Sequence, residues 1–294
     1  MITVPELAAE ALSSALSSQV IDRLGSSPGD LIQLIPSVAR LSLECIGNSD
    51  ALYHNVEHTM MVTLVGHEIM RGRTMLKPTN ADEYAHVIIA CLLHDIGYVR
   101  GILVGDSDDG YVIDQKGNKT KLPRGSSDAS LEPYHVERSK LFALDRLAGV
   151  DWIDASRVAR AIECTRFPII TDDADEEGLL VRAADLIGQL GDPHFLRKAN
   201  ALYYEFEEVG MTKQLGYESP ADIIDRYPKL YYDSVVPHLD RAIRYLNVTS
   251  AGRRWIAGLH ANVFRADNLD QMPVIMCNKT SAGRVSSQSA HVSL

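Results

Sequence analysis

Hydrophobic residues recur every three or four positions along most of the chain, with polar residues between them. This spacing is typical of amphipathic helices that bury one face. It predicts an all-α protein whose helices cover residues 5–24, 30–46, 54–71, 81–95, 133–147, 154–164, 176–190, 193–209, 220–226, 229–246 and 250–264.

One internal region departs from the helical pattern. Residues 100–132 are rich in Gly, Asp, Ser and Pro. Within them, residues 111–114 and 119–122 flank a Gly- and Asn-containing turn, which predicts a small β-hairpin insertion. A long loop inside a compact domain is often a lid or a binding element, so this region is a candidate cover for a cleft.

The chain shows no internal repeat and no Pro- or Gly-rich linker, which favours one structural domain. We expect residues 1–50 to form helices that pack on the core and residues 51–265 to form the functional part. Residues 266–294 form a C-terminal extension. Its end is polar and Ser-rich, and we expect it to be disordered.

The charge balance narrows the choice of partners. Lys and Arg total 29 against 39 Asp and Glu, a formal net charge of −10. An acidic surface has no general attraction for polyanions, so we expect neither a nucleic-acid polymer nor a membrane as a partner. A small phosphate ester stays open, because a metal ion or a few arginines can reverse the field inside one cleft.

The four cysteines are scattered and form no CxxC pair, which argues against a disulfide framework or a zinc knuckle. Glu6 and Glu10 precede the first basic residue, Arg23, and this order does not fit a signal peptide. No segment approaches the roughly 20 apolar residues that span a bilayer. These features predict a cytoplasmic protein.

Three segments bring histidine and aspartate onto helices. His54 and His58 lie at positions i and i+4 and so share one face. His94 and Asp95 end an apolar helix, where a buried His–Asp pair is costly unless it is paired or bound to a metal. Asp185 is an acidic residue inside another apolar helix.

Two histidines and two carboxylates on separate helices form a ligand set that suits a divalent cation. Four protein ligands leave coordination positions open for water and substrate. Mixed ligands of this kind admit Mn, Fe, Zn, Ni or Co at a tight site, with Mg favoured at a second, water-rich one. The alternative is a group of hydrogen-bonded polar residues that cap buried helices.

The order His58, His94-Asp95, Asp185 resembles the HD-domain metal-dependent phosphohydrolases, and Tyr53-His54-Asn55-x-x-His58 is similar to a motif of the class I cyclic-nucleotide phosphodiesterases. The resemblance implies an HD/phosphodiesterase-like helical bundle with residues 51–265 as its metal-binding catalytic domain. It also implies that His58, His94, Asp95 and Asp185 hold the tight metal and that Asp95 faces a second ion.

The same resemblance implies hydrolysis of a phosphate ester, with a nucleotide or cyclic nucleotide as the favoured substrate. A hydroxide activated by the cation would attack phosphorus, and His54 would protonate the leaving oxygen. Two positions depart from the phosphodiesterase pattern. Tyr98 stands where those enzymes carry another histidine, and Gln189 is too close to Asp185 to be their purine-binding glutamine.

Three further residues are candidates for a second metal or a phosphate contact: His135, Arg166 and Gln189. Each has a structural alternative. His135 would instead cap a helix start, Arg166 would form an ion pair, and Gln189 would lie in a helix–helix contact. His54 would instead orient a metal ligand.

Two other functions remain open from the sequence. An HD-type di-iron oxygenase would need His135 and one more ligand. A non-catalytic nucleotide-binding sensor would bind without turnover. The aromatic residues of the C-terminal helices are also compatible with a homodimer surface.

Overall fold

The computed structural model describes residues 3–23, 29–168 and 174–268, and side chains within residues 17–32 are not described. Within these ranges the chain forms 12 α-helices and one two-stranded sheet. The all-α prediction is therefore confirmed. None of the described helices is long and apolar enough to cross a membrane.

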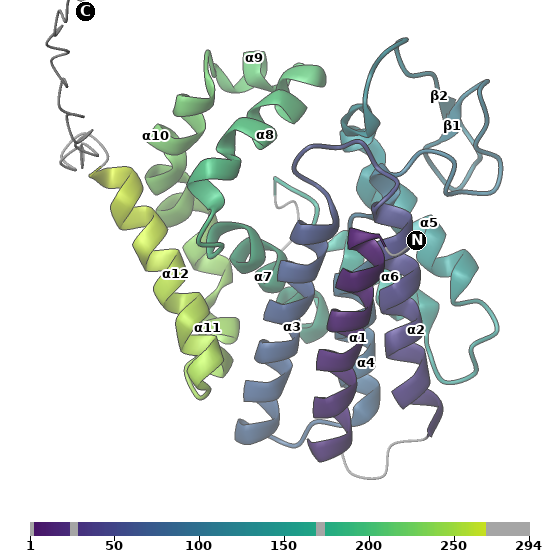
Figure 1. Cartoon of the computed structure of the whole chain (residues 1–294), viewed down its shortest axis with the longest axis vertical. Helices are drawn as coiled ribbons and strands as arrows, with labels where there is room; N and C mark the ends of the chain where they lie inside the picture. The colour runs from purple at the N-terminus through teal and green to yellow at the C-terminus, as the bar shows by residue number, and fades with distance from the viewer. Residues whose placement is uncertain (1–2, 24–28, 169–173, 269–294) are drawn as a thin grey trace, which may run out of the picture.

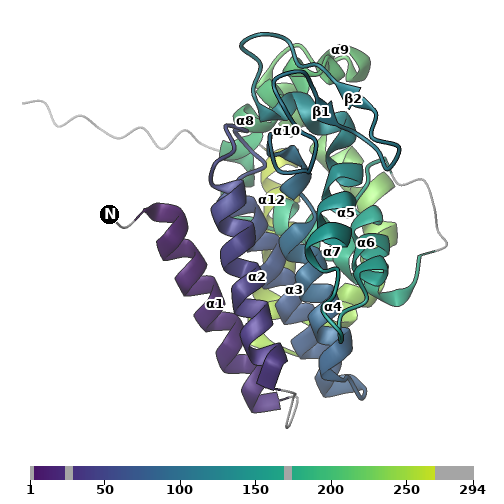
Figure 2. The same ribbon diagram turned by 90° about the vertical axis from the view of Figure 1, so that its right-hand side faces the viewer.

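The first half of the chain forms a layer of long helices that run side by side (Figure 1). These are α1 (Val4–Arg23), α2 (Gly29–Ile46), α3 (Val56–Leu76) and α4 (Ala81–Leu93). In Figure 2, α1 lies at the outer edge of this layer, against α2. Short 3-10 helices η1 (Ile96–Tyr98) and η2 (Asp128–Tyr134) flank the insertion.

The second half covers the other sides of α3 and α4. It comprises α5 (His135–Arg146), α6 (Ala155–Glu163), α7 (Glu176–Leu190), α8 (Phe195–Glu208), α9 (Met211–Leu215), α10 (Pro220–Leu230), α11 (Asp240–Leu246) and α12 (Ser250–Asp267). The helices α8 to α12 gather on one flank of the molecule (Figure 1).

The predicted hairpin is confirmed, although its strands are shorter than expected. The strands β1 (Tyr111–Val112) and β2 (Lys119–Thr120) pair antiparallel, with Tyr111 opposite Thr120. Arg138 of α5 is fully buried and holds this insertion. Its guanidinium donates to the carbonyls of Val99 and Val112 and to the Asp106 carboxylate. The insertion is therefore anchored to the helix that begins at His135.

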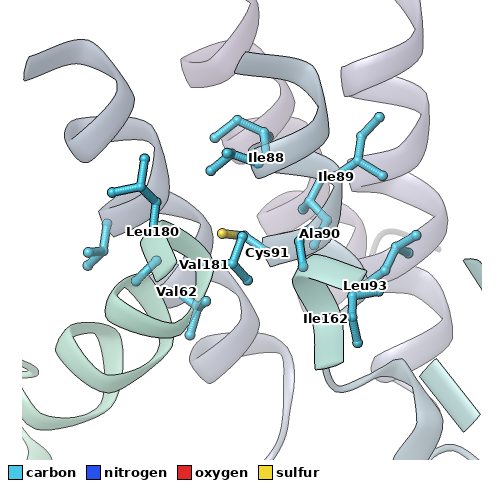
Figure 3. Packing of buried hydrophobic residues seen from close by; sticks show 14 of the residues in the cluster. Val62, Ile88, Ile89, Ala90, Cys91, Leu93, Ile162, Leu180 and Val181 are labelled. Atoms are coloured by element: carbon cyan, nitrogen blue, oxygen red, sulfur yellow. The ribbon is translucent and has the colours of Figure 1, made fainter. Parts of the chain in front are cut away.

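One cluster of buried apolar residues extends from α1 to α12. Figure 3 shows its centre, where Val62 of α3, Cys91 of α4 and Val181 of α7 pack together. Burying a side chain of this size contributes about 1.5–3 kcal/mol. Buried residues of α1 and α2, among them Leu12 and Leu43, belong to the same cluster.

The crossing of α3 and α7 depends on a glycine. A Cβ atom at Gly188 would lie 2.9 Å from the Cα and N atoms of Val62. Real Cβ atoms do not approach backbone atoms so closely, and only glycine lets the two helices pack at this distance. Asp185 precedes Gly188 by one turn and His58 precedes Val62 by one turn, so the close crossing brings these two side chains together.

The prediction of one helix over residues 229–246 is wrong. The structure has α10 up to Leu230, a π-helical turn over Tyr231–Val235, a 3-10 turn over Val236–His238, and then α11. Pro237 lacks a backbone N–H and cannot continue the helical hydrogen bonds, which explains the interruption. The sequence analysis also missed α9, and the predicted disordered end of the tail lies outside the described residues.

Candidate metal centre

Asn55 positions the first histidines of the centre. It is the N-cap of α3, and its side-chain oxygen accepts hydrogen bonds from the backbone N–H groups of Glu57 and His58. Such a cap satisfies N–H groups that have no partner inside the helix. The asparagine of the Tyr-His-Asn motif therefore fixes the first turn of the helix, in which His58 is buried.

His94 and Asp95 lie where α4 ends and η1 begins. The Nδ1–H of His94 donates to the carbonyl of Cys91 at 2.8 Å, which leaves the Nε2 lone pair available for a ligand. A Cβ at Gly97 would lie 2.0 Å from the carbonyl oxygen of His135. The glycine therefore allows the start of α5 to pack directly against the turn that carries Asp95.

The structure brings all four predicted ligands together. The Nε2 of His58 lies 3.2 Å from Asp95 Oδ2, 3.4 Å from Asp185 Oδ1 and 3.4 Å from His94 Nε2. The Nε2 of His94 lies 3.1 Å from Asp95 Oδ2 and 3.6 Å from Asp185 Oδ1. Donors about 2.1 Å from a shared ion lie about 3.0–3.4 Å apart in octahedral or tetrahedral geometry. The arrangement can therefore hold a metal ion.

The Asp95 carboxylate supplies a second observation. Its Oδ2 atom is buried and has no hydrogen-bond partner among the described residues. A buried carboxylate oxygen without a partner is costly, whereas a cation in the middle of the four donors would satisfy it. The donor set and this unsatisfied atom both fit a divalent cation.

Charge in the centre favours bound cations or protons. Burial alone would raise the pKa of Asp95, but the neighbouring His94 and His58 hold it well below its usual range. Burial alone would lower the pKa of His58, but the adjacent carboxylates of Asp185 and Asp95 outweigh this and raise it to about 10. Because metal ligation requires neutral histidine, a metal ion would displace the His58 proton.

His54 is held by an acid that the sequence analysis did not identify. Its Nδ1–H donates to Glu205 Oε2 at 2.5 Å, and the other oxygen of Glu205 accepts from the backbone N–H of Tyr53 at 2.6 Å. Burial alone would lower the pKa of His54, but the charge and hydrogen bond of Glu205 raise it. His54 Nε2 is the ring nitrogen left for a ligand.

His135 lies near Oδ1, the second carboxylate oxygen of Asp95. Its Nε2 is 3.8 Å from Asp95 Oδ1, while its Nδ1–H donates to the Glu132 carbonyl. Burial lowers the pKa of His135 to about 4, so the ring is neutral and Nε2 carries a lone pair. The lone pair at this position suits a second metal ion, and the predicted second-metal or phosphate contact of His135 stays a prediction.

Tyr98 lies against the two outer histidines, whose own ring centroids are 6.4 Å apart. Its ring stacks on His54 at 4.5 Å between centroids and on His135 at 4.4 Å, with interplanar angles of 14° and 17°. These two stacking contacts restrict the orientation of both imidazoles. The residue that departs from the phosphodiesterase pattern therefore contacts two candidate functional residues.

Arg166 and Gln189 are less clearly placed toward the centre. The Arg166 guanidinium makes a two-bond ion pair with Glu163, at 2.5 and 2.9 Å, in line with the structural alternative. Gln189 lies one turn beyond Asp185 in α7 and is partly buried. A phosphate or ligand contact by either residue stays a prediction.

Three side chains of the centre are partly exposed to solvent. The side chains of His54, His135 and Asp185 are 14%, 16% and 19% exposed, whereas those of His58, His94 and Asp95 are 5% exposed or less. A ligand would therefore approach along His54, His135 and Asp185.

Comparison with known proteins assigns the chain to a family. Searches of curated proteins and of solved structures find no match. A family model described as Npun_R2479-like matches residues 2–269, which is most of the chain. The protein therefore belongs to the Npun_R2479-like family.

Proposed function

We propose that this protein is a metal-dependent phosphohydrolase of HD-domain type that cleaves a phosphate ester of a nucleotide or cyclic nucleotide. The observation that carries the proposal is the convergence of four donor atoms, in which both histidine Nε2 atoms lie 3.1–3.6 Å from Asp185 Oδ1 and from the unsatisfied Asp95 Oδ2. The order of the His, His-Asp and Asp motifs along the sequence supports the same assignment.

A bound divalent cation would supply a Lewis acid that polarises a phosphoryl oxygen and lowers the pKa of water. His58, His94, Asp95 and Asp185 would hold this cation. His135 Nε2 and the Oδ1 atom of Asp95 would hold a second cation. The ester would approach past the partly exposed side chains of His54, His135 and Asp185.

His54 is the candidate general acid. Glu205 orients its ring and stabilises the protonated form, because the carboxylate accepts from Nδ1–H. The Nε2–H would then donate to the oxygen of the leaving group as the ester bond breaks. Tyr98 keeps the imidazole plane in position by stacking on it.

The test combines metal analysis with an ester-cleavage assay. We expect the purified protein to contain Mn, Fe, Zn, Ni or Co and to cleave bis(p-nitrophenyl) phosphate when Mn²⁺ is added. The Asp95→Asn variant should lose the metal, because one ligand and its negative charge are removed. Its rate of ester cleavage should be at least about a thousandfold lower than that of the parent. His260→Ala is the control, since this exposed histidine lies outside the centre.

Three results would overturn the proposal. Protein that takes up no metal after loading would identify the cluster as structural. Two bound irons without ester cleavage would favour the oxygenase alternative. Binding of nucleotides without turnover in the metal-loaded protein would favour a sensor.

A further inference from the structure

A separate hollow lies on the insertion, outside the metal centre. Its volume is about 260 Å³, and its lining includes Arg100, Asp108, Tyr111, Lys121 and Arg124. Sites for drug-sized ligands measure about 300–1,000 Å³, so this hollow suits a small ion or a single chemical group.

The charge of the hollow contrasts with that of the whole chain. Three cations and one acid line it, although the formal net charge of the protein is −10. Among the residues that the structure describes, Lys121 and Arg124 form no ion pair or hydrogen bond through their side chains. Both positive charges are therefore available to a ligand.

Cations on the helices around the metal centre are already engaged. Lys140 pairs with Glu137 and Glu163, and Lys198 pairs with Glu57 and Asp192. Since these charges are neutralised by neighbouring carboxylates, they offer little attraction to an added anion. The insertion is the better place for an anion.

Arg100 makes one wall of the hollow rigid. Its guanidinium donates to the carboxylates of Asp128 and Asp50 and to the carbonyl of Ser126. Arg100 follows Tyr98 by two residues, and Asp128 begins the 3-10 helix that leads to His135. The hollow is thus connected through short, hydrogen-bonded segments to both sides of the metal centre.

We propose that this hollow binds a phosphate-type oxyanion, held by Lys121 and Arg124 against the wall formed by Arg100 and Tyr111. Charge-assisted hydrogen bonds from lysine and arginine are the usual means of holding phosphoryl oxygens. The group would come either from the distal phosphate of a ligand that also reaches the metal centre or from a free phosphate ion.

The first test measures binding alone, by calorimetric titration of phosphate and pyrophosphate into the full chain in the presence of EDTA. Chelation keeps the metal centre from binding the anion, so the result is independent of the proposed hydrolase function. We expect the Lys121→Gln/Arg124→Gln variant to bind pyrophosphate at least about tenfold more weakly than the parent.

The matched control is Lys116→Gln/Lys119→Gln. It removes the same charge from the same hairpin, at exposed residues that do not line the hollow. We expect its affinity for pyrophosphate to stay within about twofold of the parent. Equal weakening in both variants would mean diffuse attraction and would overturn the proposal, as would a parent that binds neither anion. Thermal melting verifies folding, and each single variant at Lys121 or Arg124 serves if the double variant does not fold.

The second test identifies the source of the group and rests on the proposed function. If the hollow takes a distal phosphate, the Lys121→Gln/Arg124→Gln variant should raise KM for a nucleoside diphosphate but not for bis(p-nitrophenyl) phosphate. If it takes a free ion, added phosphate should change the cleavage rate of bis(p-nitrophenyl) phosphate more in the parent than in this variant. Either result agrees with an oxyanion site.

Discussion

The same three helices carry charged side chains at two ends of the bundle. At one end, α3, α4 and α7 supply the metal centre of His58, His94, Asp95 and Asp185. At the other end they supply an ion-pair network of Arg73, Lys77, Glu83 and Glu176, joined by Tyr245 of α11. Both clusters lie against the same apolar core.

The two clusters differ in how their charges are satisfied. In the network, Glu176 meets Lys77 at 2.7 Å and Arg73 at 3.3 Å, and the Tyr245 hydroxyl donates to it at 2.9 Å. In the metal centre, Asp95 Oδ2 has no hydrogen-bond partner among the described residues. Paired charges hold the helices together, whereas a buried carboxylate oxygen without a hydrogen-bond partner lowers stability until a cation binds.

The largest expected effect on stability comes from breaking the network. Arg73 is buried and donates to both Glu83 and Glu176. We expect Arg73→Met to lower the free energy of unfolding by about 3 kcal/mol, because two carboxylates lose their buried partner. Urea denaturation measures this loss, and elemental analysis should find the metal content of the variant unchanged.

The control for this substitution is Arg254→Met, at an exposed arginine of α12. It should change stability by no more than about 0.5 kcal/mol. If Arg73→Met were as stable as this control, the network would not contribute to stability. If it lost the metal while remaining folded, the two ends of the bundle would not be independent.

A smaller effect is expected at the metal centre from Glu205→Gln. The glutamine keeps a hydrogen-bond acceptor for the Tyr53 N–H but removes the charge that raises the pKa of His54. We expect kcat for ester cleavage to fall about tenfold, or about 1.4 kcal/mol, with unchanged metal content. A general acid with a lower pKa loses its proton earlier, so the decline of kcat with rising pH should move to lower pH.

Glu207→Gln is the matched control, because it makes the same change at an exposed position of the same helix. It should leave both kcat and the pH profile unchanged. A Glu205→Gln variant with a lower kcat but an unmoved pH profile would show that Glu205 has only a structural role.

The clustering of His58, His94, Asp95 and Asp185 was predictable because each lies in a short motif at the end or on the inner face of an apolar helix. Glu205 was not, since its partner His54 is far away in the sequence and only tertiary packing joins them. A signal was present: Glu205 falls at helical spacing from the buried Ala199 and Leu202, on the apolar face of α8. An acid in that position is a candidate for a specific buried contact.

The helices were predictable wherever apolar spacing ran uninterrupted, as in α3, α4 and α7. The error over residues 229–246 arose because the apolar pattern continues through Pro237 while the backbone hydrogen bonds cannot. The missed α9 is too short to show a period, and glycines with positive φ, Gly210 and Gly216, bound it. Local backbone chemistry overrode the hydrophobic pattern in both places.

The smallest expected effect is the pH dependence of the network. Burial alone would raise the pKa of Glu176, but Lys77, Tyr245 and Arg73 outweigh this and lower it to about 2 from the usual 4.5. The folded state thus binds a proton less readily than the unfolded chain. This stabilisation is present above pH 4.5 and is lost as the pH falls toward 2.

Glu176→Gln should therefore be less stable than the parent by about 1 kcal/mol at pH 7, a modest value because the side chain is partly exposed to solvent. The difference should shrink steadily below pH 4.5 and be nearly absent near pH 2. Denaturation at a series of pH values measures it, and a constant difference would contradict the proposed ion pairing. Because the substitution leaves the metal ligands in place, metal content at pH 7 should match the parent. A parallel loss of metal would instead show that the paired end of α7 positions Asp185.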